Sequence, residues 1–73
     1  MTFEIWDRQS GNLVGEYPTP EEALELVREI AQDDGPAVAQ ALTFGVADGR
    51  QRYRLAVGAD LIQLAHAGEA ATA

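Results

Sequence analysis

The stretch ALTFGVADGRQRYRLAV, residues 41–57, predicts a β-hairpin from which the rest of the fold can be worked out. Asp48-Gly49 is a strong signal for a two-residue type I′ turn, and strand-forming residues lie on both sides of it. We therefore expect strands over Ala41–Ala47 and Arg50–Val57. In this register one side of the hairpin is largely apolar, with the facing pairs Val46–Gln51, Phe44–Tyr53 and Leu42–Leu55.

The other side of this hairpin carries three of the five arginines, because strand side chains alternate between faces. In the expected register Arg50, Arg52 and Arg54 lie opposite the small residues Ala47, Gly45 and Thr43. The row could bind a phosphate backbone, with Trp6 stacking on a base. Alternatively it neutralises carboxylates, namely Glu4 and Glu16, on the same face of the sheet. We favour the second interpretation, because exposed ion pairs are common and each contributes only about 0–1 kcal/mol.

A second hairpin is predicted at the start of the chain, with strands over Thr2–Asp7 and Asn12–Tyr17. The loop Gln9-Ser10-Gly11 suits a type I turn closed by a left-handed glycine. The expected register places Phe3, Ile5, Leu13 and Tyr17 on one face and Glu4, Trp6, Val14 and Glu16 on the other. Trp6, next to Val14, is then either an anchor for a partner or buried by the C-terminal segment through Leu61, Ile62 and Leu64.

Residues 18–33 combine helix-start signals with an apolar stripe. Thr19 is a suitable N-cap, Pro20 suits the first helical position, and Glu22 completes a capping box with Thr19. The stripe predicts a helix that runs to about Asp33 and is ended by Gly35 and Pro36. Its members are Ala23, Leu24, Val27, Ile30 and Ala31, with Leu26 at the edge.

An acidic flank lies on the opposite side of this helix, at Glu21, Glu25 and Glu29. We interpret it either as a solvated surface or as a docking surface for a basic protein. Asp33 and Asp34 follow at the helix C-terminus, where the helix dipole disfavours anions. We favour the solvated surface for the flank, and the placement of Asp33 and Asp34 gives the docking interpretation only slight additional support.

The last segment, Ala59–Ala67, is predicted to be a short helix, although a fifth strand fits its apolar run as well. The order of elements therefore predicts an α+β fold, ββαββ(α), in one domain over residues 1–67. We expect a four-stranded, mainly antiparallel sheet with one long helix packed on one face. Residues 68–73 are expected to be a flexible tail. The sequence does not determine the order of the strands.

The composition excludes several kinds of chemistry. The 73 residues include no cysteine and no lysine, so thiolate metal sites, cysteine nucleophiles and Schiff bases are excluded. The single histidine, His66, has no partner pattern that indicates catalysis. We therefore expect no enzyme, no metal or other cofactor and no small-molecule substrate. The lack of cysteine, of a signal-peptide pattern and of an apolar run of about 20 residues predicts a cytoplasmic protein that does not cross a membrane.

Two strands followed by TPEEALELVREIAQ, residues 19–32, resemble the ββα start of HicB-type antitoxin domains. The resemblance covers about half of the chain. The Pro/Gly-rich segment usual before that helix is missing here, as is an appended DNA-binding unit. The resemblance implies a toxin-neutralising or otherwise inhibitory role and transfers no functional residue.

These observations lead us to expect a small acidic, non-enzymatic module that binds another protein or a second copy of itself. The net charge of −7, from 5 cationic and 12 acidic residues, repels nucleic acid and anionic lipid. Nucleic-acid binding through the arginine face is one alternative, and an acidic inhibitor that occupies a basic groove is another. The candidate interaction surface comprises Trp6, Val14, Arg50, Arg52, Arg54, Glu21, Glu25 and Glu29.

Overall fold

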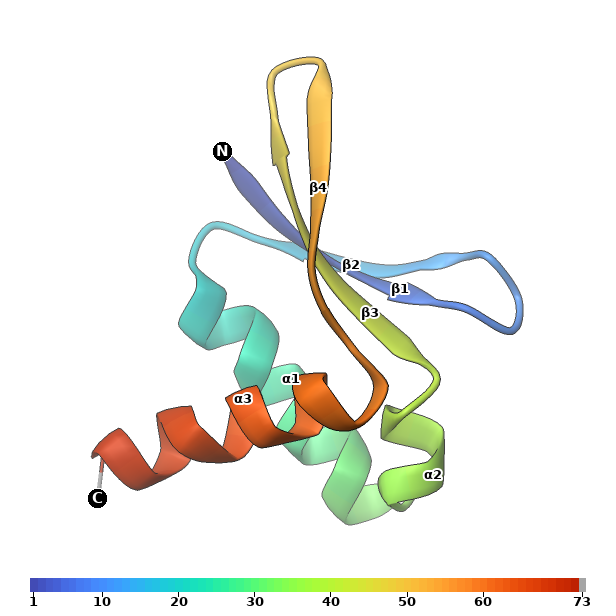
Figure 1. Cartoon of the computed structure of the whole chain (residues 1–73), viewed down its shortest axis with the longest axis vertical. Coiled ribbons are helices and arrows are strands. Elements are labelled where there is room, and N and C mark those ends of the chain that lie inside the picture. The colour runs from blue at the N-terminus through green and yellow to red at the C-terminus, as the bar shows by residue number, and fades with distance from the viewer. Residues whose placement is uncertain (73) are drawn as a thin grey trace.

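Two β-hairpins lie next to each other in one sheet, and the helices pack against a single face of that sheet (Figure 1). The computed structural model describes the backbone of residues 1–72 and the side chains of residues 1–67. The elements are β1 (Thr2–Asp7), β2 (Leu13–Tyr17), α1 (Pro20–Asp33), α2 (Pro36–Ala39), β3 (Leu42–Asp48), β4 (Gln51–Val57) and α3 (Gly58–Thr72). The predicted α+β order is confirmed, with the four-residue α2 as an addition.

The strand order is β2-β1-β3-β4, and all neighbouring strands are antiparallel. The two hairpins join through β1 and β3, where Glu4 faces Gly45 and Ile5 faces Phe44. β1 and β3 are therefore the central strands, and the second strand of each hairpin is an edge. Helix α1 carries the chain from the β2 edge to β3.

The register of the first hairpin is as predicted from Phe3 to Ile5 and then changes at a β-bulge. Beyond the bulge Trp6 faces Leu13, so the predicted pairing of Trp6 with Val14 is wrong. The extra residue in β2 is Val14, because a bulge sets two residues of one strand against one of the other. The predicted left-handed turn glycine is confirmed by the φ of 75° at Gly11.

The register of the second hairpin differs from the prediction in two ways. Asp48 faces Gln51, so the turn residues are Gly49 and Arg50, and the facing pairs are shifted by two positions. Because side chains alternate with a period of two, this shift leaves Arg52 and Arg54 on the predicted face. A second bulge between Phe44 and Gly45 then brings Ala56, rather than Tyr53, opposite Phe44.

Helix α1 begins and ends where the sequence predicts. The hydroxyl oxygen of Thr19 accepts a hydrogen bond from the backbone N–H of Glu22 at 3.3 Å. Pro20 occupies the first turn and Asp33 is the last helical residue. Ala23 and Val27, fully buried, belong to the predicted apolar stripe that packs on the sheet.

Helix α3 packs on the same face of the sheet as α1, which corrects the prediction of one long helix. Its Leu61 is fully buried in the core with Ile5 and Val27. The guanidinium of Arg28 on α1 donates to the carbonyl oxygen of Ala65 at 2.8 Å and ties the two helices together. The last segment is thus a helix and not a fifth strand, and it extends beyond Ala67 to Thr72. The predicted flexibility of residues 68–73 lies outside the described side chains and stays a prediction.

Candidate interface on the open sheet face

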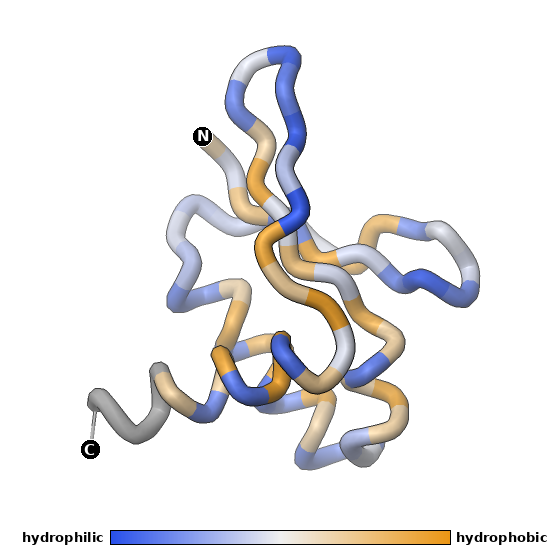
Figure 2. Tube along the Cα trace, in the orientation of Figure 1, coloured by the Kyte–Doolittle hydropathy of each residue, from blue (hydrophilic) through white to orange (hydrophobic). Residues whose placement is uncertain are grey.

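One face of the sheet, the open face, carries no helix. Its residues are Thr2, Glu4, Trp6, Glu16, Thr43, Gly45, Ala47, Arg52 and Arg54. The helices all lie on the other side of the sheet (Figure 1). Hydrophilic residues line the tip of the β3–β4 hairpin, which projects away from the helices (Figure 2). The open face is therefore the large surface of the sheet that remains available to a partner.

Glu4 lies at the centre of the open face and is only 2% exposed, although no helix covers it. Two neighbouring side chains contact one oxygen of its carboxylate, Oε1. The Nε atom of Arg52 lies 3.3 Å from Oε1 of Glu4, and the indole Nε1 of Trp6 donates to the same oxygen at 3.4 Å. A buried charge is tolerated when it is paired and hydrogen-bonded in this way. These two contacts to Glu4 orient the indole of Trp6 and the guanidinium of Arg52 on the open face.

The three arginines of the predicted row have different surroundings. Arg52 pairs with Glu4 while its own side chain remains 70% exposed. Arg54 projects from β4 opposite Gly45, and Arg50 lies in the turn. Within the described residues neither Arg50 nor Arg54 forms an ion pair, and Glu16 forms none either. The neutralising interpretation therefore holds for Arg52 and Glu4, and two guanidinium groups of the row keep their charge available.

Trp6 is partly buried on the open face, between Leu13 of β2 and Thr43 of β3. Leu13 is 39% exposed, so the bulge creates an apolar pair that the sequence did not predict. The interpretation that Leu61 helps to bury Trp6 is wrong, because Leu61 lies in the core under the opposite face. Val14 lines a groove with residues of α1 and α2 instead of lying next to Trp6.

Strand β4 borders the open face and is one of the two edge strands of the sheet. All five residues from Gln51 to Leu55 are exposed, including Tyr53 at 52% and Leu55 at 49%. The outer edge of β4 has no neighbouring strand, so its backbone N–H and C=O groups on that side are not paired within the sheet. The sequence gives no signal for this edge, because strand order depends on which hairpins meet.

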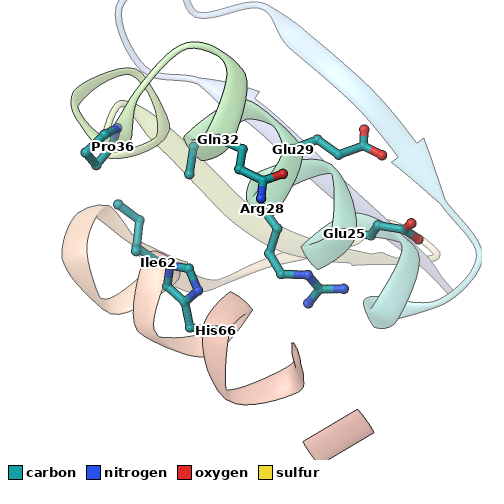
Figure 3. A pocket seen from close by; sticks show the side chains of 8 residues that line it. Glu25, Arg28, Glu29, Gln32, Pro36, Ile62 and His66 are labelled. Carbon is teal, nitrogen blue, oxygen red and sulfur yellow. The ribbon is translucent and has the colours of Figure 1, made fainter. Parts of the chain in front are cut away.

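The acidic flank of α1 lies in the helix layer, away from the arginine row of the β3–β4 hairpin. Glu21, Glu25 and Glu29 are all exposed. Glu25 and Glu29 also line an open cleft of about 490 Å³ between α1 and α3, together with Arg28, Gln32 and His66 (Figure 3). Arg28 and Gln32 point toward α3, whereas the two carboxylates point to another side of α1 (Figure 3). The cleft thus does not bring its acids together with His66.

Within the described part of the chain no three acidic or histidine side chains are grouped closely enough to hold a metal ion. No helix of residues 1–72 is long and apolar enough to cross a bilayer. Comparison of the chain with protein-family models, with curated proteins and with solved structures finds no match. The resemblance of residues 19–32 to HicB-type antitoxin domains therefore gains no further support from these comparisons.

Proposed function

We propose that the protein is a non-enzymatic module that binds a partner protein along strand β4 and the adjoining open face. The observation that carries this proposal is the exposure of every residue from Gln51 to Leu55 on a sheet edge. An extended segment of a partner can add to such an edge, because main-chain hydrogen bonds supply affinity and alternate side chains supply specificity. Tyr53 and Leu55 add apolar surface to the same strand.

The side chains of β4 define the chemistry of the partner segment. Arg52 and Arg54 project on the open face, about 7 Å apart at the usual strand rise. A partner strand with glutamate or aspartate at every second position would place its carboxylates opposite these guanidinium groups. Its other side chains would lie on the face of Tyr53 and would be apolar. The favoured partner is thus an extended segment of alternating acidic and apolar residues.

A second copy of this chain fits the β4 edge less well. Symmetric antiparallel pairing of two β4 strands around Tyr53 sets Arg52 of one copy opposite Arg54 of the other. Like charges that face each other directly across a strand pair are destabilising. The predicted homodimer therefore requires another surface or an anion between the two arginine rows.

Nucleic acid is the second candidate, and a specific observation supports it: Arg50 and Arg54 have no ion pair within the described residues. The partly buried Trp6 on the same face offers limited surface for stacking. The overall charge of −7 opposes this candidate, as it opposes an acidic peptide, and a polyanionic nucleic acid meets the stronger repulsion. An acidic peptide and an oligonucleotide would compete for the same guanidinium groups, so the two candidates are separated by measuring the affinity of the protein for each ligand.

A titration with defined ligands tests the proposal. The ¹⁵N-labelled protein is titrated with an acetylated heptapeptide of alternating glutamate and valine, and with a matched lysine–valine peptide. We expect amide shifts in Gln51–Leu55 with the acidic peptide alone, and at least about tenfold weaker binding after Arg54→Glu. The matched control is the double substitution Glu25→Arg and Glu29→Arg on α1, which should leave binding unchanged.

Four outcomes would overturn the proposal or replace it. Equal binding of both peptides, or no shift in β4 at peptide concentrations of about 1 mM, excludes strand addition at this edge. Binding of the lysine–valine peptide that is lost in the α1 variant supports the acidic-inhibitor alternative. A dissociation constant for an oligonucleotide at or below about 1 µM, weakening with salt, supports nucleic-acid binding instead.

A further inference from the structure

A groove of about 350 Å³ lies on the helix side of the sheet, where the loop of the β1–β2 hairpin approaches α2 and the end of α1. α2 and this loop lie at the same end of the molecule (Figure 1). The lining of this hairpin groove includes Asp7, Val14, Ile30, Asp34, Val38 and Leu42. Its volume is near the lower end of the range of roughly 300–1,000 Å³ typical of ligand sites.

Hydrogen bonds hold the walls of the hairpin groove in place. The backbone N–H of Arg8 donates to the carbonyl oxygen of Ala41 at 2.9 Å. The guanidinium of Arg8 donates to the carbonyl oxygens of Gln40 and Ala41. In the loop the Asp7 carboxylate accepts from the N–H of Gln9 and from the hydroxyl of Ser10, each at 3.0 Å. The groove is therefore preformed, which lowers the entropic cost of binding.

The floor of the hairpin groove is apolar and open to solvent. Val14 is 44% exposed and Val38 is 47% exposed, with Ile30 and Leu42 behind them. The β2 bulge is what brings Val14 into this position, because regular alternation would place it on the open face. The groove thus exposes aliphatic surface that a matching side chain would cover.

The rim of the hairpin groove is acidic. Asp34 lines it next to Asp33, and the last turn of α1 contains no basic residue. Both carboxylates stand at a helix C-terminus, where the dipole disfavours them. Neither side chain has a hydrogen bond or ion pair within the described residues. The guanidinium of Arg8 keeps its charge while it donates to two backbone carbonyls, and the rim is net acidic because Asp7, Asp33 and Asp34 outnumber this cation.

We propose that the hairpin groove docks a short peptide segment of a partner protein, in which one bulky aliphatic side chain is followed by arginine or lysine. The aliphatic side chain would cover Val14 and Val38, and the cation would approach Asp34. This assignment explains why Asp33 and Asp34 lie at the C-terminus of α1, where they do not stabilise the helix. The proposal is independent of strand addition at β4, because the groove lies next to β2 and β4 is the edge strand on the other side of the four-stranded sheet.

Three matched probes test the proposal: acetyl-Ala-Leu-Ala-Arg-Arg-amide, the same peptide with glutamate for arginine, and the same peptide with alanine for leucine. Methyl and amide NMR signals of the protein report where each one binds. We expect the first peptide to shift Val14, Ile30 and Val38, and to bind at least about fivefold more tightly than either matched peptide. Its affinity should fall as salt is added.

Two variants keep the test decisive. Asp34→Asn should weaken binding about threefold or more while the unfolding transition stays in place, because only a surface charge is removed. Arg54→Glu on β4 should leave this binding unchanged, which separates the groove from the proposed β4 interface. Equal binding of the three peptides, shifts that map elsewhere, or no shift at about 2 mM peptide would overturn the assignment.

Discussion

The ion pair between Glu4 and Arg52 gives the sharpest quantitative test of the open face. The perturbation is a double-mutant cycle with Glu4→Ala, Arg52→Ala and both together. Such a cycle isolates the interaction between the two side chains from their other contacts. Glu4→Ala alone also removes the acceptor of the Trp6 indole and some buried methylene surface, so its single effect includes more than the ion pair.

The expected coupling free energy follows from the geometry. The Arg52 Nε and Glu4 Oε1 atoms are 3.3 Å apart, and Glu4 is almost fully buried. The Arg52 side chain, however, is 70% exposed, so water screens the pair and solvates whichever partner remains. We therefore expect a coupling of about 0.5–1 kcal/mol, as for surface pairs, and not the 3–5 kcal/mol of a broken buried pair. Arg52→Ala alone should cost about 1 kcal/mol.

Urea unfolding followed by far-UV circular dichroism measures each corner of the cycle, since Trp6 fluorescence would itself respond to the substitutions. The control cycle pairs Glu4→Ala with Arg54→Ala and should give a coupling below about 0.3 kcal/mol, because Arg54 has no ion pair in the described residues. The Glu4–Arg52 coupling should fall when salt is raised to about 0.5 M. A coupling no larger than that of the control, or one above about 3 kcal/mol, would refute this account.

Three further predictions concern the free energy of unfolding, measured by urea titration. Leu61→Ala should cost about 2–5 kcal/mol because Leu61 is fully buried, whereas Leu64→Ala at a 40% exposed position should cost under about 1 kcal/mol; equal costs would contradict the placement of α3. Gly45→Ala should cost about 2 kcal/mol, since the new Cβ would lie 2.8 Å from the backbone oxygen of Tyr53; a neutral effect would contradict the bulge geometry. Thr19→Ala should cost about 1 kcal/mol through loss of the N-cap, and no change would show that the cap contributes nothing.

Local signals were enough to predict the four strands and helix α1. Turn glycines, the Thr19 cap and the alternation of the strands act over a few residues, and each indicates one structure. The side on which Arg52 and Arg54 project was also predicted, because the two-residue shift in register preserves the faces. The four strands and α1 consequently lie within one residue of their predicted bounds.

The features that the sequence did not predict depend on contacts between distant segments. The bulge places Leu13, and not Val14, opposite Trp6. Because both residues are aliphatic, the hydrophobic pattern of the sequence is the same for either arrangement. The burial of Glu4 requires Arg52, which reaches it only because β1 and β3 pair. The hairpin groove combines residues of β1, β2, α1, α2 and β3. A local sequence motif cannot predict a groove formed by segments so far apart in the chain.

The central position of β1 has a consequence for how the chain reaches its folded state. β1 can pair with β2 as soon as the first hairpin forms, but its other neighbour is β3, about forty residues further along the chain. Closing so long a loop is entropically costly and tends to slow folding. During synthesis the first hairpin forms before its second neighbour exists. Until residues 42–48 have left the ribosome, one edge of β1 has no strand to pair with and the side chain of Ile5 is not packed against β3.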